Sequence, residues 1–416
     1  MPSYFHKVSN SCKYAQISLK NLYICANTLP FVLHVPISPN VGQLYLMCRY
    51  SENCFKMMKM RRSLFCICAL SLLFMTFSCT APAGYVTISG YAQGGTYTVK
   101  ANLKGVDVSP QELRDSIDAI LQAVDKSVSG YNKGSILSRL NRGEAVVPDR
   151  ILLDLYRRSS EIYVKTGGCV DVAGAALFDI WGFGFKTGQM PSDQKVAETL
   201  ASSGMDRLVS DMEVVLGDGN FLSPESLLLP AEKDNGTFPV LPQLNFNAVA
   251  QGYSCDIVAA YLSRVGVKDM MVDIGEIFCQ GVNPDGHPWK LGIDRPLDGN
   301  NTPGADLQGV FAAPSRPCGI VTSGNYRKFY IHNGKKYAHT IDPRTGYPVR
   351  HHLLSATVVA PDGFTADAYA TYCMVVGPDQ AKAFITAEPS LEACLVMADG
   401  DSTAIWCSDG FVLESI

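Results

Sequence analysis

Hydrophobic side chains alternate with polar ones in some stretches of the chain and recur at helical spacing in others. Residues 96–103, "TYTVKANL", alternate as a half-buried strand does. Residues 109–132 and 149–168 carry apolar side chains three or four positions apart, which predicts two helices. Ser109 and Pro110 are typical of an N-cap and a first helical position, so the first helix is expected to begin there.

The second half of the chain predicts more strands than helices. Helices are expected at 247–266 and 365–377, and residues 185–240 are interpreted as surface elements and loops. The remaining apolar runs predict strands at 268–275, 289–294, 318–324, 327–341 and 353–361, and a final strand pair within 392–413. No internal repeat or long linker interrupts this order, which indicates one compact α+β unit with mixed or antiparallel sheets and flanking helices. This unit could also be divided into two lobes around a cleft.

The first eighty residues follow a different pattern. Residues 58–84 combine a Lys and Arg cluster, a nearly continuous apolar run over 63–77, and small residues at Ser78 and Cys79. This is typical of a secretory signal peptide and too short to span a membrane comfortably. It resembles the bacterial lipoprotein type, in which Cys79 would be acylated as the first mature residue; ordinary cleavage near Ala83 is the alternative.

A signal peptide begins at a true N-terminus, so translation is expected to start at Met57, Met58 or Met60. Residues 1–56 are then an upstream extension without its own fold, although 31–37, "FVLHVPI", also has the composition of a strand. Export would place the protein at the periplasmic face of a membrane, lipid-anchored through Cys79, or soluble in the periplasm.

Composition and charge exclude several classes of function. With 47% hydrophobic and 18% charged residues the chain is an ordinary globular protein. Residues 1–79 hold eight Lys and Arg and one acidic residue, which leaves a formal net charge of −11 for the rest and argues against a nucleic-acid partner. The cysteines after Cys79 are scattered without a CxxC pair, which predicts buried apolar residues rather than a zinc site or dense disulfide framework.

Residues 339–349, "HTIDPRTGYPV", concentrate polar groups where Pro343 and Pro348 disfavour a helix or a central strand. A rigid, bent loop of this kind suits reactive groups held in fixed geometry. The alternative is a surface turn whose polar side chains are merely solvated.

Asp367 and Thr371 lie four residues apart in "TADAYAT", so their side chains share one helix face. A carboxylate and a hydroxyl among small alanines suit a hard cation such as Mg²⁺, which prefers oxygen ligands. The alternative is that Asp367 caps the first turn and Thr371 bonds back to a carbonyl.

Two other segments carry weaker signals. A polar turn leads into the helix at "NFNAVAQGYSCD", residues 245–256, whose N-terminal amides could receive a phosphate. Residues 166–184 end in an aromatic cluster in which Trp181, Phe183 and nearby Phe185 could stack on a heteroaromatic ring, although core packing is the commoner role.

The order of these segments resembles the ApbE family, the FAD:protein FMN transferases, over about residues 85–400. The resemblance is carried by "GGCVD", "AQGYSCD", "VDIG", "TSGNYRKF", "HTIDPRTGYPV" and "TADAYAT". It implies an ApbE-like (T-fold-like) domain over residues 80–416 with FAD in a cleft. It also implies an Mg²⁺-dependent enzyme that transfers FMN from FAD to a Thr or Ser hydroxyl of a target protein, such as a subunit of a membrane electron-transfer complex, and releases AMP.

The same resemblance implies roles for individual residues. Asp367, Thr371 and the backbone carbonyl of Ala248 match metal ligands, and His339 matches the proposed base. The matches to FAD-binding positions are Gln93, Thr96, Tyr131, Cys169, Val170, Asp171, Asn245, Gln251 and Thr340.

The chain departs from the family pattern near several of these positions. Gln251 stands in place of Lys or Glu, Asn245 in place of Asp, Gln93 in place of Met, and "VDIGEI" lacks one Gly of a pair. Because none of these changes removes a metal ligand or His339, activity is expected to survive. Alternative interpretations are an FAD pyrophosphatase that uses water as acceptor, a flavin-binding lipoprotein without turnover, and an extracytoplasmic adhesion or solute-binding protein.

Overall fold

The computed structural model describes residues 84–185, 190–233, 241–300, 302–400 and 402–415, all within one unit of the chain, 81–416. The predicted upstream extension, signal peptide and Cys79 anchor, and the alternative strand at 31–37, lie outside the described residues. Within the described ranges no helix has both the length and the apolar character needed to cross a bilayer.

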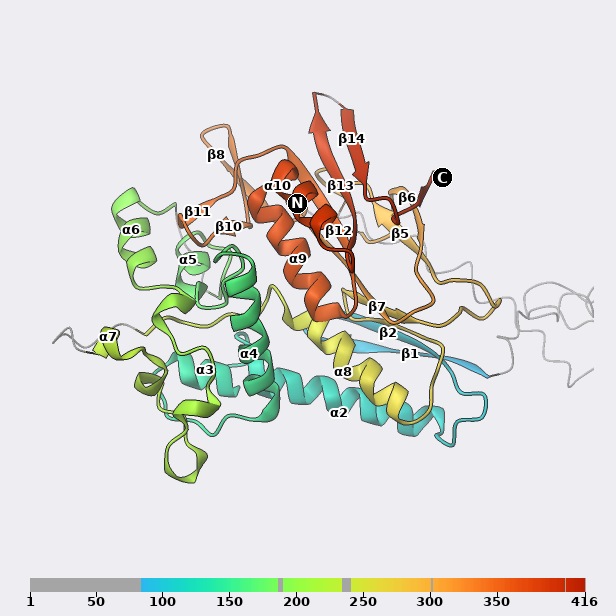
Figure 1. The fold of residues 1–416 in the computed structure, drawn as a ribbon, viewed down its shortest axis with the longest axis horizontal. Coiled ribbons are helices and arrows are strands. Elements are labelled where there is room, and N and C mark those ends of the chain that lie inside the picture. Colours follow the sequence, from blue (N-terminus) through green and yellow to red (C-terminus); the bar gives the residue numbers. More distant parts are fainter. Residues whose placement is uncertain (1–83, 186–189, 234–240, 301, 401, 416) are drawn as a thin grey trace, which may run out of the picture. The chain divides into compact units, whose positions relative to one another are not determined.

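An eight-stranded sheet in the order β1-β2-β3-β4-β7-β12-β13-β14, with every neighbouring pair antiparallel, forms the centre of the fold (Figure 1). Its strands are β1 (Tyr85–Ala92), β2 (Gly95–Asn102), β3 (Met270–Asp273), β4 (Ile277–Gln280), β7 (Cys318–Gly324), β12 (Leu353–Ala360), β13 (Glu392–Asp399) and β14 (Ser402–Cys407). The strand β12, "LLSATVVA", is buried along nearly its whole length, as expected for a central strand covered on both faces.

Helices cover one face of this sheet. The helices α2 (Pro110–Val128), α8 (Ala250–Arg264), α9 (Gly363–Val376) and α10 (Pro378–Ala387) contact its successive strands from β1 to β13 (Figure 1). The predicted N-cap Ser109 is confirmed and is part of a capping box at the start of α2: Ser109 accepts from the backbone N–H of Glu112, and the Glu112 carboxylate accepts from that of Ser109.

A smaller antiparallel sheet contributes to a second apolar cluster with β4, β7, β12 and β13. It consists of β15 (Leu413–Glu414), β6 (Leu307–Ala312) and β5 (Lys290–Asp294) in that order. Trp289, Phe311 and Phe411 are buried there beside Val359 and Val396 of the large sheet. The central strands are therefore enclosed on both faces.

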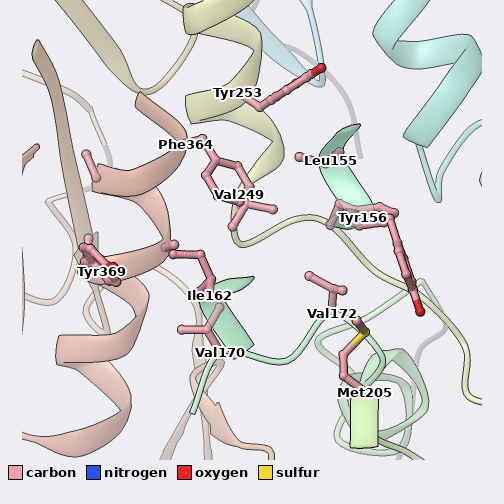
Figure 2. Close-up of a cluster of buried hydrophobic side chains, with 14 of the residues drawn as sticks. Leu155, Tyr156, Ile162, Val170, Val172, Met205, Val249, Tyr253, Phe364 and Tyr369 are labelled. Atoms are coloured by element: carbon pink, nitrogen blue, oxygen red, sulfur yellow. The ribbon is translucent and has the colours of Figure 1, made fainter. Parts of the chain in front are cut away.

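The largest hydrophobic cluster joins α8 and α9 to a helical region in the middle of the sequence. Figure 2 shows Leu155, Tyr156 and Ile162 of α4 (Arg150–Lys165) with Phe364 of α9 and with Val170, all of them buried. The same cluster includes Val172, Val249 and Tyr253. It fixes the loop around residue 170 beside the beginning of α8, where several predicted site residues lie. The other short helices in this region are α3 (Ile136–Asn141), α5 (Ala175–Ile180), α6 (Asp193–Ala201) and α7 (Pro230–Lys233).

The predicted fold class is confirmed, and two local predictions need correction. The single strand expected at 327–341 is a hairpin of β8 (Phe329–His332) and β9 (Lys335–Ala338), because Asn333 and Gly334 adopt positive φ and reverse the chain. The segment 185–240, expected to form only surface elements and loops, also contributes side chains to the core. Met212 and Leu222 are fully buried, since their apolar side chains complete the cluster around α4.

The crossing of α8 and α9 requires small residues. A Cβ added at Gly252 would lie 2.2 Å from the carbonyl oxygen of Gly363 and 2.9 Å from the Cβ of Asp367. Each of these distances is below the separation that real Cβ contacts show, so only glycine permits the two helices to approach this closely.

Gly252→Ala is expected to lower the free energy of unfolding by about 1–3 kcal/mol, because the methyl group must push α8 away from α9. The measurement is chemical denaturation. Gly95→Ala is the control, since nothing lies within 4 Å of a Cβ at that position. Equal stability of the two variants would show that the crossing tolerates a side chain.

Candidate active site

A cavity of about 320 Å³ opens where the end of β7, the beginning of α8, the middle of α9, the loop around residue 170 and the segment after β9 meet. Of the residues predicted from the sequence, the cavity wall includes Tyr131, Cys169, Val170, Asp171, Asn245, Ala248, Gln251, His339, Thr340, Asp367 and Thr371. Gln93 and Thr96 are not among its lining residues. Side chains from segments far apart in the sequence thus share one cavity, as a single site requires.

Asp367 is buried inside α9 and does not cap it. Its Oδ2 accepts from the backbone N–H of Gly252 in the first turn of α8 at 3.1 Å. Burial, and secondarily the charge of Asp256, raise the pKa of Asp367 to about 8, although the Gly252 hydrogen bond opposes the shift. A carboxylate removed from water in this way is more stable with a cation beside it.

The N-terminus of α9 is held by three charged side chains from different elements. Asp362 is its N-cap and accepts from the backbone N–H of Thr365 at 2.8 Å, while Asp256 of α8 accepts from those of Gly363 and Phe364. Arg158 of α4 donates to Asp362 at 2.8 Å. These contacts set the rotation of α9 and hence the direction of Asp367 and Thr371.

Glu276 is a second carboxylate in the cavity wall, in the turn between β3 and β4. Burial raises its pKa well above the ordinary value, and the nearby charge of Asp367 adds to the shift. Two neighbouring carboxylates in a site of low polarity repel each other unless a proton or a cation lies between them. The described residues contain no cluster of three His, Cys, Asp or Glu side chains that could hold a metal. Hydroxyl and carbonyl oxygens would have to complete the site, and this donor set fits a hard cation such as Mg²⁺.

The loop that carries Cys169, Val170 and Asp171 forms another wall. Asp171 accepts from the backbone N–H groups of Ala173 at 2.7 Å and Met205 at 3.2 Å. Burial raises its pKa to about 6 despite these two bonds. Asp171 therefore organises the loop backbone in addition to facing the cavity.

Asn245 and Gln251 flank the entry to α8. The Oδ1 of Asn245 accepts from the backbone N–H of Asn247 at 2.9 Å, which shapes the turn before the helix. The Nε2 of Gln251 donates to the carbonyl of Ile274 at 3.1 Å, and Gly275 leaves room for this contact because a Cβ there would lie 2.7 Å from that nitrogen. Gln251 thus connects α8 to the "VDIGEI" turn, so two of the four departures from the family pattern contact each other.

The aromatic cluster divides between core and cavity. Trp181 is buried and packs on Tyr337 and Tyr347, so the core role holds for this residue. Phe183 lines the cavity, and its ring lies 6.4 Å from that of His339 between centroids. Phe185 packs edge-on against the largely exposed ring of Tyr131 at the cavity wall.

His339 lies between β9 and β10 (Ile341–Asp342), with its ring in the cavity wall. Its backbone N–H and its Nδ1 both face the carbonyl oxygen of Lys328, at 3.1 and 3.2 Å. An Nδ1–H donating to this carbonyl leaves Nε2 unprotonated and able to accept a proton. Burial, followed by the positive charge of Lys328, lowers the pKa of His339 to about 4, so the ring is neutral at neutral pH.

The segment after His339 is a short ribbon that packs on the rest of the molecule. β10 pairs with β11 (Tyr347–Pro348), and Arg344 forms a bidentate ion pair with Asp342 inside the turn. Trp181 Nε1 donates to the carbonyl of Gly346 at 2.8 Å. Only Arg344 and Thr345 at the tip of the turn are exposed, whereas His339, Thr340 and Pro343 line the cavity.

Gln93 lies outside the cavity lining and contacts the helix α8 that forms part of its wall. It occupies the β1–β2 turn with a φ of 52°, and its Nε2 donates to the Oγ of Ser254 on α8. Its predicted contact with FAD stays a prediction, as does that of Thr96.

Several cavity residues were not predicted from the sequence: Asn247, Glu276, Thr322, Ser323, Tyr326, Arg327 and Lys328. All of them lie inside segments already singled out in the sequence: Asn247 in "NFNAVAQGYSCD", Glu276 in "VDIGEI" and the others in "TSGNYRKF". Glu276 could have been noticed as a carboxylate directly before the strand β4.

Comparison with known proteins agrees with this geometry. The model of the ApbE family matches residues 93–395. The chain belongs to the ApbE family. Among its ApbE relatives, the FAD:protein FMN transferase of Escherichia coli strain K12 is 32% identical over 323 residues, which cover 75% of this chain and 84% of the relative. The FAD:protein FMN transferase of Vibrio cholerae serotype O1 is 30% identical over 352 residues, or 82% of this chain and 96% of the relative.

Solved ApbE structures have the same fold. The flavin transferase ApbE from Vibrio cholerae superposes with a TM-score of 0.65 at 28% identity and covers 80% of this chain and 100% of its own. The apo flavinyl transferase ApbE from Pseudomonas stutzeri also gives 0.65 at 28% identity, with coverages of 78% and 95%. The resemblance seen in the sequence motifs is therefore confirmed at the level of family and fold.

Proposed function

We propose that this protein transfers FMN from FAD to a Thr or Ser hydroxyl of a target protein and releases AMP. The observation that carries the proposal is one cavity that unites the Asp367 and Thr371 pair with the neutral imidazole of His339. The relatives named above are FAD:protein FMN transferases, which supports the same reaction here.

The residues Asp367, Thr371 and the carbonyl of Ala248 would hold Mg²⁺. All three line the cavity, and a positive partner would stabilise the ionised form of the buried Asp367 carboxylate. When bound, the ion neutralises charge on the FAD diphosphate and favours displacement at phosphorus, which contributes several kcal/mol to lowering the barrier.

His339 acts on the acceptor hydroxyl. Nε2 takes the hydroxyl proton while the acceptor oxygen forms its bond to the FMN phosphorus and the bond from that phosphorus to the AMP oxygen breaks. The Lys328 carbonyl holds the Nδ1–H and thus the orientation of the ring. Because Lys328 also lines the cavity, its ammonium group adds positive potential where the transferred phosphate would lie.

Aromatic side chains define the place for the flavin. Phe178, Phe183 and Tyr131 all line the cavity. Asn247 donates to the hydroxyl of Tyr131 at 3.3 Å, which connects this ring to the turn before α8. Planar rings of this kind stack on the isoalloxazine system and exclude water from the diphosphate.

The location of the reaction is also part of the proposal. The signal-like segment that ends at Cys79 supports export and a lipid anchor, and a membrane electron-transfer subunit is the kind of acceptor that such an anchor would bring close. Labelling cells with a radioactive fatty acid tests the anchor, since Cys79→Ala should lose the label.

The direct test of turnover separates nucleotide products by chromatography. Purified protein with FAD and Mg²⁺ is expected to release AMP in amounts that match the acceptor peptide added. Release of AMP and free FMN in equal amounts without any acceptor would instead identify a pyrophosphatase.

The pH dependence of transfer should follow Asp367 and not His339. At limiting Mg²⁺ the rate is expected to fall as pH drops below about 8, because protons compete with the cation for the carboxylate. Raising Mg²⁺ should move this acidic limb to lower pH, since the base stays neutral down to about pH 4. If the rate instead falls with a midpoint near the ordinary histidine pKa of 6.5, and this midpoint does not change with Mg²⁺ concentration, the titration belongs to His339 and this reasoning is wrong.

A further inference from the structure

Two cysteines far from the cavity lie directly opposite each other at the edge of the large sheet. Cys394 of β13 and Cys407 of β14 are partners in the antiparallel register. The next pair along, Ala393 and Ser408, is joined by the Ser408 N–H donating to the Ala393 carbonyl at 2.9 Å. Hydrogen-bonded and non-hydrogen-bonded pairs alternate, so Cys394 and Cys407 form a non-hydrogen-bonded pair, in which Cα atoms lie about 4.5 Å apart. This separation is within the range that a disulfide spans.

The two thiols already contact each other. They share a side-chain hydrogen bond, which raises the pKa of the Cys394 thiol and lowers that of Cys407. Cys394 is fully buried among the side chains beneath the small sheet, whereas Cys407 is half-buried and can be reached from solvent. The more accessible thiol therefore has the lowered pKa, and the other lies behind it.

A second cysteine pair in the same cluster provides a contrast. Cys279 of β4 and Cys318 of β7 are also register partners, and both are fully buried. The Cys318 thiol points towards the carbonyl oxygens of Cys279 and Pro314, at 3.8 and 3.9 Å, and not towards the other sulfur. Neither accessibility nor orientation prepares this pair for oxidation.

We propose that Cys394 and Cys407 form a disulfide that fastens the edge strand β14 to β13 when the chain meets a disulfide oxidant. The Cys407 thiolate attacks one sulfur of the oxidant, forms a mixed disulfide and releases one thiol. The Cys394 thiol then gives up its proton, attacks the Cys407 sulfur and releases the second thiol. The oxidant disulfide is reduced to two thiols, and the protein loses two hydrogen atoms. Oxidants of this class act on exported proteins, and the proposal is independent of the transferase reaction.

The sequence makes the pair easy to observe. No Lys or Arg follows Lys382, so trypsin leaves residues 383–416 as one peptide whose two cysteines are Cys394 and Cys407. The reduced full-length protein is incubated with oxidised glutathione, alkylated with iodoacetamide in denaturant and digested. We expect this peptide to appear without alkyl groups, lighter by two hydrogen atoms than its reduced form, and to accept two alkyl groups after reduction. Recovery of the peptide with both cysteines alkylated would overturn the proposal.

Variants separate the pair from the other cysteines. Cys394→Ser should retain glutathione on Cys407, because the second thiol is missing, and Cys318→Ser should still form the 383–416 disulfide. Oxidation should raise the melting temperature by about 5 °C, since the cross-link restricts the unfolded chain, and Cys407→Ser should lose this shift. A disulfide that joins the peptides of Cys279 and Cys318 while residues 383–416 stay reduced would contradict the selectivity argued here.

Discussion

Asp367→Asn is expected to lower the rate of FMN transfer by about 10³-fold or more while the protein stays folded, because the amide keeps the shape of the carboxylate and loses its charge. The buried Asp367 shares its cavity with Thr371 and Ala248, so the change removes the anionic member of the proposed cation site. Transfer and any FAD hydrolysis should fall together. The measurement is the rate of AMP release at saturating FAD and Mg²⁺.

Thermal unfolding provides a second readout for the same variant. The folded-state pKa of Asp367, about 8, lies above its ordinary value of 3.8, so the stability tied to its protonated form is present at low pH and lost as pH rises through about 8. Without divalent cations the wild type should therefore melt at lower temperature at pH 8 than at pH 5, and Mg²⁺ should raise the melting temperature at pH 8 and so remove the difference. Asp367→Asn should lack this Mg²⁺ effect. Asp379→Asn, at an exposed position in the first turn of α10, is the matched control. An Asp367→Asn variant that keeps both wild-type turnover and the Mg²⁺ shift would exclude Asp367 as a ligand.

His339→Ala is expected to reduce transfer by roughly 10²- to 10⁴-fold, because no group then accepts the proton of the hydroxyl. FAD affinity should change little, since the cavity is lined by many other side chains. Fluorescence titration of FAD gives the affinity, and single-turnover transfer to an acceptor peptide gives the rate.

His332→Ala is the control for this variant, because His332 is exposed at the end of β8, on the hairpin that precedes His339, and does not line the cavity. It should transfer FMN at the wild-type rate. If the His339 variant also keeps the wild-type transfer rate, the assignment of the base is wrong.

The motifs predicted the chemically central part of the cavity because each is a short segment with strong local chemistry. Asp367 and Thr371 share a helix face by their spacing alone, and the prolines around residue 345 indicate a bent segment. The strand 318–324 was predicted with the bounds that the structure has, since its apolar run is flanked by Pro317 and Asn325. Family resemblance added Tyr131, Asn245 and Gln251, which carry no strong signal of their own.

Other features depended on contacts between distant segments. That Asp367 accepts from Gly252 and not from its own helix follows from the crossing of α8 and α9, which no local pattern predicts. The low pKa of His339 results from burial and from the charge of Lys328. Lys328 precedes β8 and His339 follows β9, so the β8–β9 hairpin brings the two residues together. Glu276 was missed because its proximity to Asp367 comes from the β3–β4 turn lying beside α9, a consequence of sheet order and not of spacing in the sequence.

Mass spectrometry of an acceptor domain incubated with the purified protein, FAD and Mg²⁺ tests the central claim most directly. The predicted result is a mass increase of one FMN phosphoester on a Thr or Ser of the acceptor, with one AMP released for each, and its loss in both Asp367→Asn and His339→Ala. An unmodified acceptor beside free FMN and AMP, or beside intact FAD, would contradict it.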